Sequence, residues 1–174
     1  GNADVDKADD DGRTLLRYAS SNNFIRAAEL LLDYGADVDR ADFKRGSPLI
    51  HACIAGNTEM ASLLLARGAD TNIVTDGGMT AFMAACTTGH VATAQRLMEI
   101  GRVEVDQVNR DGMTPLGIAC MDNHTAVAQL LLESGAKMDW TDKKGRTALW
   151  IACQKGHASA AKLLLEKGAQ VDQA

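Results

Sequence analysis

The chain has 174 residues, of which 46% are hydrophobic and 24% charged, and its formal net charge is −5. This composition is that of a folded globular protein and excludes a disordered chain. The acidic balance argues against nucleic-acid binding, which needs clustered positive charge. No apolar run approaches the ~20 residues of a membrane span, so direct membrane insertion is not expected.

A unit of 33 or 34 residues recurs five times along the chain. Each unit contains a hydroxyl residue followed two positions later by a large apolar residue; these hydroxyl residues are Thr14, Ser47, Thr80, Thr114 and Thr147. A glycine recurs at the same intervals, at Gly35, Gly68, Gly101, Gly135 and Gly168. Self-similarity at such a period indicates stacked supersecondary units. The expected unit boundaries are about 7–39, 40–72, 73–106, 107–139 and 140–172.

Each unit predicts two short helices separated by a break. The Thr or Ser suits a helix N-cap because its hydroxyl accepts a backbone N–H, and Pro48 and Pro115 suit the first helical position. An apolar stripe at helical spacing follows, as at Leu49, Ala52 and Cys53. The second helix is rich in leucine and ends at the recurring glycine, which can adopt the left-handed conformation beyond a helix terminus.

Cysteine and histidine each recur at one position of the unit, so we expect structural roles for both. The cysteines are Cys53, Cys86, Cys120 and Cys153, and the three recurring histidines, of four in the chain, are His90, His124 and His157. Equivalent helices pack ~8–10 Å apart, whereas a disulfide needs Cα atoms within about 7 Å, so the cysteines are expected to be small buried residues. The histidines lie at the break between helices, where they can satisfy backbone groups. No zinc spacing or catalytic motif accompanies them, and we expect neither a metal, a cofactor nor an enzyme.

The units resemble the ankyrin repeat, whose pattern is D-x-x-G-x-T-P-L-H-x-A-A-x-x-G-H, followed by a Leu-rich helix and G-A-D-V-N. The resemblance covers about residues 3–172. It implies one all-α domain over residues 1–174, a monomeric solenoid of stacked helix-turn-helix units with β-turn fingers and a concave face. The family's histidine after Pro-Leu is replaced in all five units, by Arg17, Ile50, Met83, Gly117 and Trp150. Gly46 lies one place later than its counterparts, and we expect the second finger tip to differ in shape.

The resemblance implies that the concave face, made of finger tips and first helices, binds other proteins. Carried over by position, this candidate partner site comprises Asp10, Asp11, Arg13, Phe43, Lys44, Ile54, Met79, Thr87, Thr88, Arg110, Met113, Met121, Lys143, Lys144, Arg146, Trp150, Gln154 and Lys155. Its charge is acidic in the first unit and basic in the last, and its centre is apolar and rich in methionine. We interpret it as a non-catalytic scaffold surface that binds a protein segment. The alternative for the middle units is that these side chains fold back against adjacent fingers.

Two other functions stay open from sequence. The chain can be a structural spacer within a longer array, or a regulatory domain that responds to a nucleotide or small ligand through Lys143, Lys144 and Arg146. Neither terminal unit carries the polar capping face usual in solenoids, so we expect a segment excised from a longer array; Trp150 would then face a partner, solvent or a further repeat. Reduced cysteines predict an intracellular location, in the cytoplasm or alternatively the nucleus.

Overall fold

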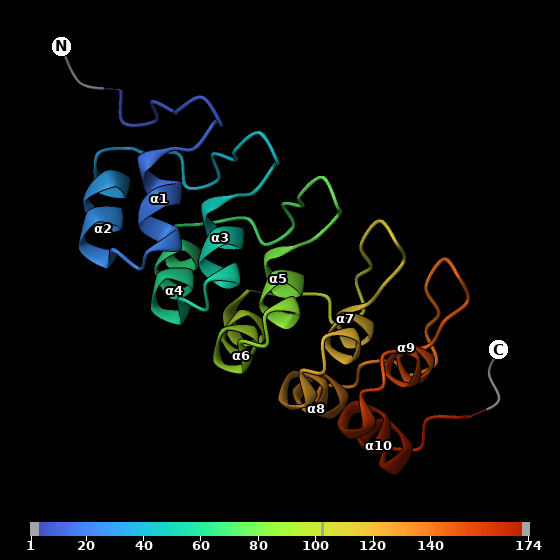
Figure 1. Ribbon diagram of the computed structural model, residues 1–174. Coiled ribbons are helices and arrows are strands. Elements are labelled where there is room, and N and C mark those ends of the chain that lie inside the picture. Colours follow the sequence, from blue (N-terminus) through green and yellow to red (C-terminus); the bar gives the residue numbers. More distant parts are fainter. Residues whose placement is uncertain (1–3, 102, 172–174) are drawn as a thin grey trace.

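The computed structural model describes residues 4–101 and 103–171, which form ten α-helices in five pairs (Figure 1). The first helices of the pairs are α1 (Leu15–Ser21), α3 (Pro48–Ile54), α5 (Ala81–Thr87), α7 (Pro115–Met121) and α9 (Ala148–Gln154). The second helices are α2 (Ile25–Asp33), α4 (Thr58–Ala66), α6 (Val91–Ile100), α8 (Thr125–Glu133) and α10 (Ala158–Glu166). No strand occurs in this part of the chain. The prediction of an all-α repeat architecture is confirmed.

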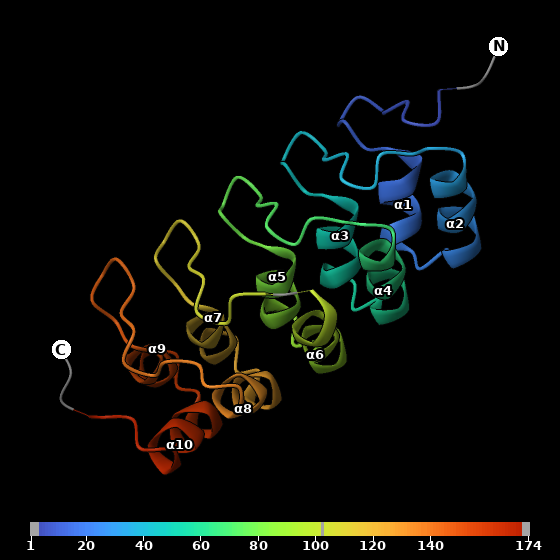
Figure 2. The same cartoon turned by 180° about the vertical axis from the view of Figure 1, so that it is seen from behind.

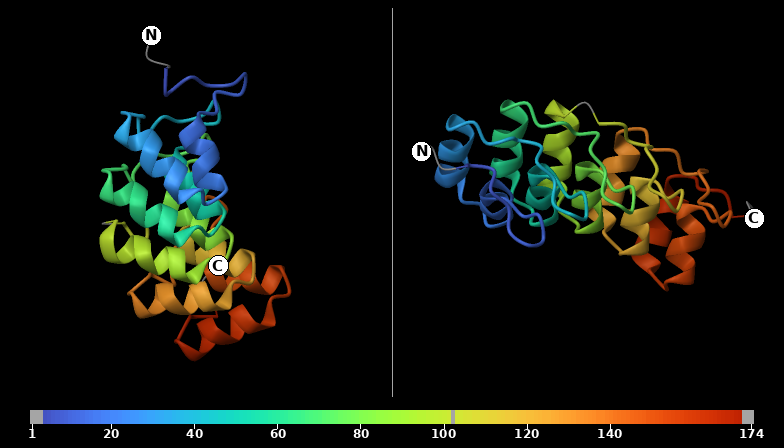
Figure 3. Two further views of the ribbon diagram at one scale, coloured as in Figure 1. Left: turned by 90° about the vertical axis from the view of Figure 1, so that its left-hand side faces the viewer. Right: turned by 90° about the horizontal axis from the view of Figure 1, so that it is seen from above.

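The helix pairs stack side by side in chain order and form two rows. Each odd-numbered helix contacts the next odd-numbered helix, and each even-numbered helix contacts the next even-numbered one. Figure 2 shows the two rows from behind. A loop before each odd helix projects outward as a finger, and the five fingers follow one another along the same side of the stack (Figure 3).

Each odd helix begins at the predicted hydroxyl residue. The side chains of all five accept a hydrogen bond from the backbone N–H three residues later, at 3.2 Å in four helices and 3.4 Å at Ser47. Pro48 and Pro115 occupy the first helical position, where no intrahelical donor is needed. The capping prediction is confirmed, and it explains why every odd helix begins at the same place in its repeat.

The prediction of buried cysteines is confirmed for three of the four and wrong for Cys153 in the fifth repeat. Cys53, Cys86 and Cys120 are free thiols buried between neighbouring odd helices. Burial raises the pKa of the Cys53 and Cys120 thiols to about 12, so both stay protonated and unreactive. Cys153 is exposed, because no further helix pair packs against α9 among the described residues.

Histidines at the helix break satisfy backbone carbonyls, as predicted, and they join the third, fourth and fifth repeats to the repeat before. Asn57 takes this place in the second repeat. Nε2–H of His90 donates to the Ile54 carbonyl at 3.2 Å, and His124 donates in the same way to Thr87 at 2.9 Å. His157 repeats this bond with Met121 at 3.0 Å. The carbonyls lie at the C-terminal ends of the preceding odd helices, whose last carbonyls have no intrahelical partner. These bonds fix the spacing of adjacent helix pairs.

Candidate functional site

The fingers and the exposed side of the odd helices form one surface, which we call the finger face; it corresponds to the predicted concave face. Its loops comprise residues 7–13, 40–46, 73–79, 107–113 and 140–146. Adjacent fingers are tied by single backbone hydrogen bonds, such as Phe43 N–H to the Asp11 carbonyl at 3.2 Å and Lys143 N–H to the Asp111 carbonyl at 3.0 Å. The finger face is therefore a continuous surface with a fixed spacing between its units.

The second finger keeps the shape of the others, so the prediction of a different tip is wrong. Arg45 adopts a positive φ of 62°, where the first finger has Gly12 at 76°. Its N–H donates to the Asp42 carbonyl at 2.8 Å, and Gly12 N–H makes the equivalent bond with Asp9 at 2.9 Å. The displaced Gly46 has another consequence, because it occupies a position that carries a large side chain in the other fingers. These side chains are Arg13, Met79, Met113 and Arg146.

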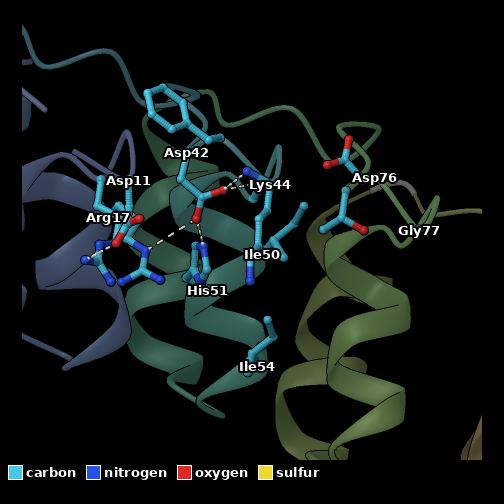
Figure 4. Close-up of a pocket in the computed structure, with 13 residues that line it drawn as sticks. Asp11, Arg17, Asp42, Lys44, Ile50, His51, Ile54, Asp76 and Gly77 are labelled. Atoms are coloured by element: carbon cyan, nitrogen blue, oxygen red, sulfur yellow. Dashed lines mark hydrogen bonds and ion pairs between the residues drawn. The ribbon is translucent and has the colours of Figure 1, made fainter. Parts of the chain in front are cut away.

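Gly46 leaves space for a polar cluster between the first two repeats (Figure 4). A Cβ atom on Gly46 would lie 2.6 Å from Nε2 of His51. This Nε2–H instead donates to Oδ2 of Asp42 at 2.8 Å, and Nε of Arg17 lies 3.7 Å from the same oxygen. The other carboxylate oxygen of Asp42 accepts the N–H groups of Lys44 and Gly46 at 3.0 and 2.9 Å. We call Arg17, Asp42 and His51 the polar cluster.

The electrostatics of the polar cluster favour a charged Asp42 beside a neutral His51. Burial opposes ionisation of Asp42, but hydrogen bonds from Gly46 N–H and His51 outweigh it and lower the pKa of the carboxyl. Burial lowers the pKa of His51, and the Arg17 charge adds to this, despite the hydrogen bond with Asp42. Nε of Arg17 is buried and makes no hydrogen bond with any described residue. The cluster thus contains a guanidinium with unused donor capacity.

The lowered pKa of His51 predicts a loss of stability in mild acid. Below the ordinary histidine pKa of 6.5 the unfolded chain binds a proton that folded His51 resists, so the free energy of unfolding falls as the pH falls. Urea unfolding between about pH 7.5 and 5.5 measures this slope. His51→Gln keeps an N–H donor for Asp42 without titrating, and is expected to reduce the slope. An equal slope in this variant would contradict the assignment.

A cavity of about 670 Å³ opens on the finger face beside the polar cluster. It lies between the first three fingers and the helices α1 and α3, and Figure 4 shows the side chains around it. One wall is the polar cluster. The apolar lining residues are Phe43, which is 75% exposed, Ile54, which is 45% exposed, and Ile50, which is only 1% exposed. This combination of apolar surface and few converging polar groups is typical of binding pockets.

The predicted exposed methionine centre is wrong. Met113 is only 6% exposed and packs with Met83, Ile118 and Ile151 in a second core cluster. Met79 and Met121 are half-buried against the same cluster. The physical reason is that the finger side chains fold down onto the odd helices, which is the alternative that the sequence left open. Other predicted residues that are half-buried are Arg13, Thr87, Thr88 and Arg146.

Most of the remaining predicted residues are exposed on the finger face. They are Asp10, Asp11, Phe43, Lys44, Ile54, Arg110, Lys143, Lys144, Trp150, Gln154 and Lys155. Arg146 is held in place by Asp142, whose Oδ2 lies 2.6 Å from Nη2, and by Gln154, to which Nη1 donates at 3.1 Å. Its guanidinium also lies 5.4 Å from the ring centroid of Trp150. Arg146 therefore supports the last finger, and the neighbouring lysines carry the accessible charge.

Sequence reasoning missed the polar cluster and the cavity. Asp42 and His51 were not predicted as site residues, and Arg17 was noted only as a departure from the family pattern. Two signals could have found them: the displaced Gly46, and a histidine placed one position after the family's usual one. In the second repeat, glycine replaces the large finger side chain found at this position elsewhere. His51 then takes the contact with Asp42 that Arg146 makes with Asp142 in the last finger.

The described residues contain no group of three or more His, Cys, Asp or Glu that could hold a metal ion. Their helices are also too short and too polar to cross a membrane.

Comparison with known families agrees with the repeat architecture. A family model described as ankyrin repeats (3 copies) matches residues 39–107 and 94–174, and one described as ankyrin repeat matches residues 11–43. No curated protein matches the chain. Ankyrin repeats generally mediate protein–protein interactions. With matches over most of its length and five stacked helix pairs, the chain belongs to the ankyrin-repeat family.

Proposed function

We propose that the chain is a non-catalytic module that binds a segment of another protein along the finger face. The observation that carries this proposal is the cavity of about 670 Å³ on that face. Apolar surface in a pocket on an otherwise polar protein favours a ligand that covers it. The fingers continue this surface from the cavity to the lysines of the last repeat, so an extended segment can contact several repeats at once.

The charge along the finger face supports a defined orientation of the segment. Asp10 and Asp11 are exposed in the first finger, and Lys143, Lys144 and Lys155 are exposed in the last repeat. These lysines have no ion pair with a described residue. Opposite charges on a partner would steer its approach and set its direction. We expect basic partner residues near the first repeat and acidic ones near the last.

Reversal of the basic end tests this proposal. The double substitution Lys143→Glu and Lys144→Glu is expected to slow association of a captured partner by about tenfold at low salt and to weaken its salt dependence. Arg146 is left intact because its loss would leave the carboxylate of Asp142, which is 3% exposed, without its cation.

The matched control is Lys162→Glu with Lys167→Glu, which makes the same change in net charge on the even-helix side of the last repeat. Stopped-flow or surface-plasmon measurements of the association rate compare the two variants. Equal rates for the wild type and the finger-face variant would refute the orientation. Binding that survives every finger-face substitution would favour a spacer role instead.

A further inference from the structure

The contact between finger and odd helix occurs in two forms within this one chain. In the third and fourth repeats the finger side chains Met79 and Met113 fold onto the odd helices and close the space. In the second repeat the same position is Gly46, and the space stays open as the cavity. The polar cluster lines only part of the cavity. At the repeat position of Arg17 the third repeat has the buried Met83, and at that of His51 the fourth repeat has the buried Ile118. The opening thus coincides with the finger that has glycine at the position of Arg13, Met79, Met113 and Arg146 in the other fingers.

The side chains that line the cavity are both charged and apolar, and their formal charges sum to zero. Its charged lining residues are three cations and three carboxylates: Arg13, Arg17, Lys44, Asp11, Asp42 and Asp76. A charged occupant would meet like charges as well as opposite ones, so the charged lining residues would add little to its binding free energy. Phe43 and Ile54 offer exposed apolar surface to an occupant. Arg17 has only Asp42 within ion-pair distance among the described residues, at 3.7 Å, and its side chain is 19% exposed. Its Nε is buried and has no hydrogen-bond partner among them.

We infer that the cavity binds an extended, uncharged stretch of a partner polypeptide, with one large apolar side chain against Phe43 and Ile54. A backbone carbonyl of that stretch accepts a hydrogen bond from the Arg17 guanidinium. Every peptide bond supplies such an acceptor, and guanidinium donors bind acceptors strongly in a partly buried site. The inference rests on the proposed function and names the part of the partner that the second repeat selects.

The cavity volume fits this occupant better than it fits a single ion. About 670 Å³ lies within the range of roughly 300–1,000 Å³ found for organic ligands. A phosphate group would meet three carboxylates as well as three cations in this lining, so repulsion offsets attraction. The charge balance therefore favours a polypeptide with neutral residues over a nucleotide.

The test begins with selection of binders from a phage-displayed library of random peptides on the whole immobilised chain. Synthetic copies of the enriched peptides are then titrated by fluorescence polarisation. Ile54→Trp fills the cavity from its mouth, and it is expected to be tolerated because Ile54 is the exposed last residue of α3. Ile100→Trp is the matched control, since it makes the same substitution at the exposed last residue of the even helix α6, away from the finger face. Arg17→Met removes the guanidinium and keeps the aliphatic stem.

The enriched peptides are expected to share one large apolar residue flanked by uncharged residues. Ile54→Trp and Arg17→Met should each weaken peptide binding by about tenfold or more. Ile100→Trp should bind the peptides as the wild type does, and all three variants should keep the wild-type helix content by circular dichroism. Recovery of no peptide whose binding Ile54→Trp weakens overturns the inference. If such peptides are instead weakened by Lys143→Glu with Lys144→Glu, the proposed function stands and only the cavity assignment fails; if neither variant weakens any peptide, both fail.

Discussion

Replacement of Phe82 with alanine is expected to lower the free energy of unfolding by about 3–5 kcal/mol. Phe82 is 2% exposed and lies in α5, the central odd helix, between α3 and α7. Loss of its ring leaves a cavity in a stack that can relax only partly. Because each repeat is stabilised mainly by its neighbours, the loss in the middle repeat also weakens the coupling between the two halves. Urea unfolding followed by circular dichroism measures the change.

An exposed phenylalanine, Phe43, provides the matched control for the effect of burial. Phe43 is 75% exposed on the second finger, and Phe43→Ala is expected to change the free energy of unfolding by less than about 1 kcal/mol. Similar losses for Phe43→Ala and Phe82→Ala would contradict the assignment of the core to the odd-helix row.

The substitution Asp42→Asn is expected to destabilise the protein by about 2–3 kcal/mol. The amide oxygen of asparagine can still accept the two backbone hydrogen bonds of the finger. Asn109 does so in the fourth finger, where it accepts the equivalent N–H groups at 2.9 and 3.0 Å. The change therefore removes the carboxylate charge and leaves Arg17 without an ionic partner while it stays largely buried. Thermal and urea unfolding of the variant measure the loss.

A double-mutant cycle separates this electrostatic effect from a general disturbance of the finger. Arg17→Met removes the cation that the Asp42 carboxylate compensates, so Asp42→Asn should cost less in that background by about 1 kcal/mol. Strict additivity of the two substitutions would show that Arg17 and Asp42 do not interact, and would remove the basis of the polar cluster.

The repeat architecture could be predicted from the sequence because its signals are local and recur five times. Each N-cap hydroxyl acts on a backbone N–H three residues away, and the histidine at the helix break meets a carbonyl of the preceding repeat in every case where it occurs. Such periodic positions have the same surroundings in each repeat. Cys153 has the same position in its unit as the other cysteines but is exposed, because no further described helix pair packs against α9.

The binding surface was harder to predict because it depends on how neighbouring repeats differ. Met113 matches the pattern of an exposed finger residue, yet its burial is decided by Ile118 and Ile151 on two later helices. The cavity depends on a missing side chain at Gly46 and on His51, which reaches Asp42 only because that side chain is missing. The shared repeat pattern does not indicate this combination; only the departures of the second unit from that pattern, Gly46 and His51, point to it.

Mapping of a bound peptide by nuclear magnetic resonance tests the central claim most directly. Isotope-labelled protein is titrated with an enriched peptide, and the shift of each backbone amide is followed. The largest changes are expected at Lys44, His51 and Ile54, around the opening that Gly46 creates. Largest changes on the even helices α4 and α6 instead would place the partner on the opposite side of the stack and contradict a finger-face site.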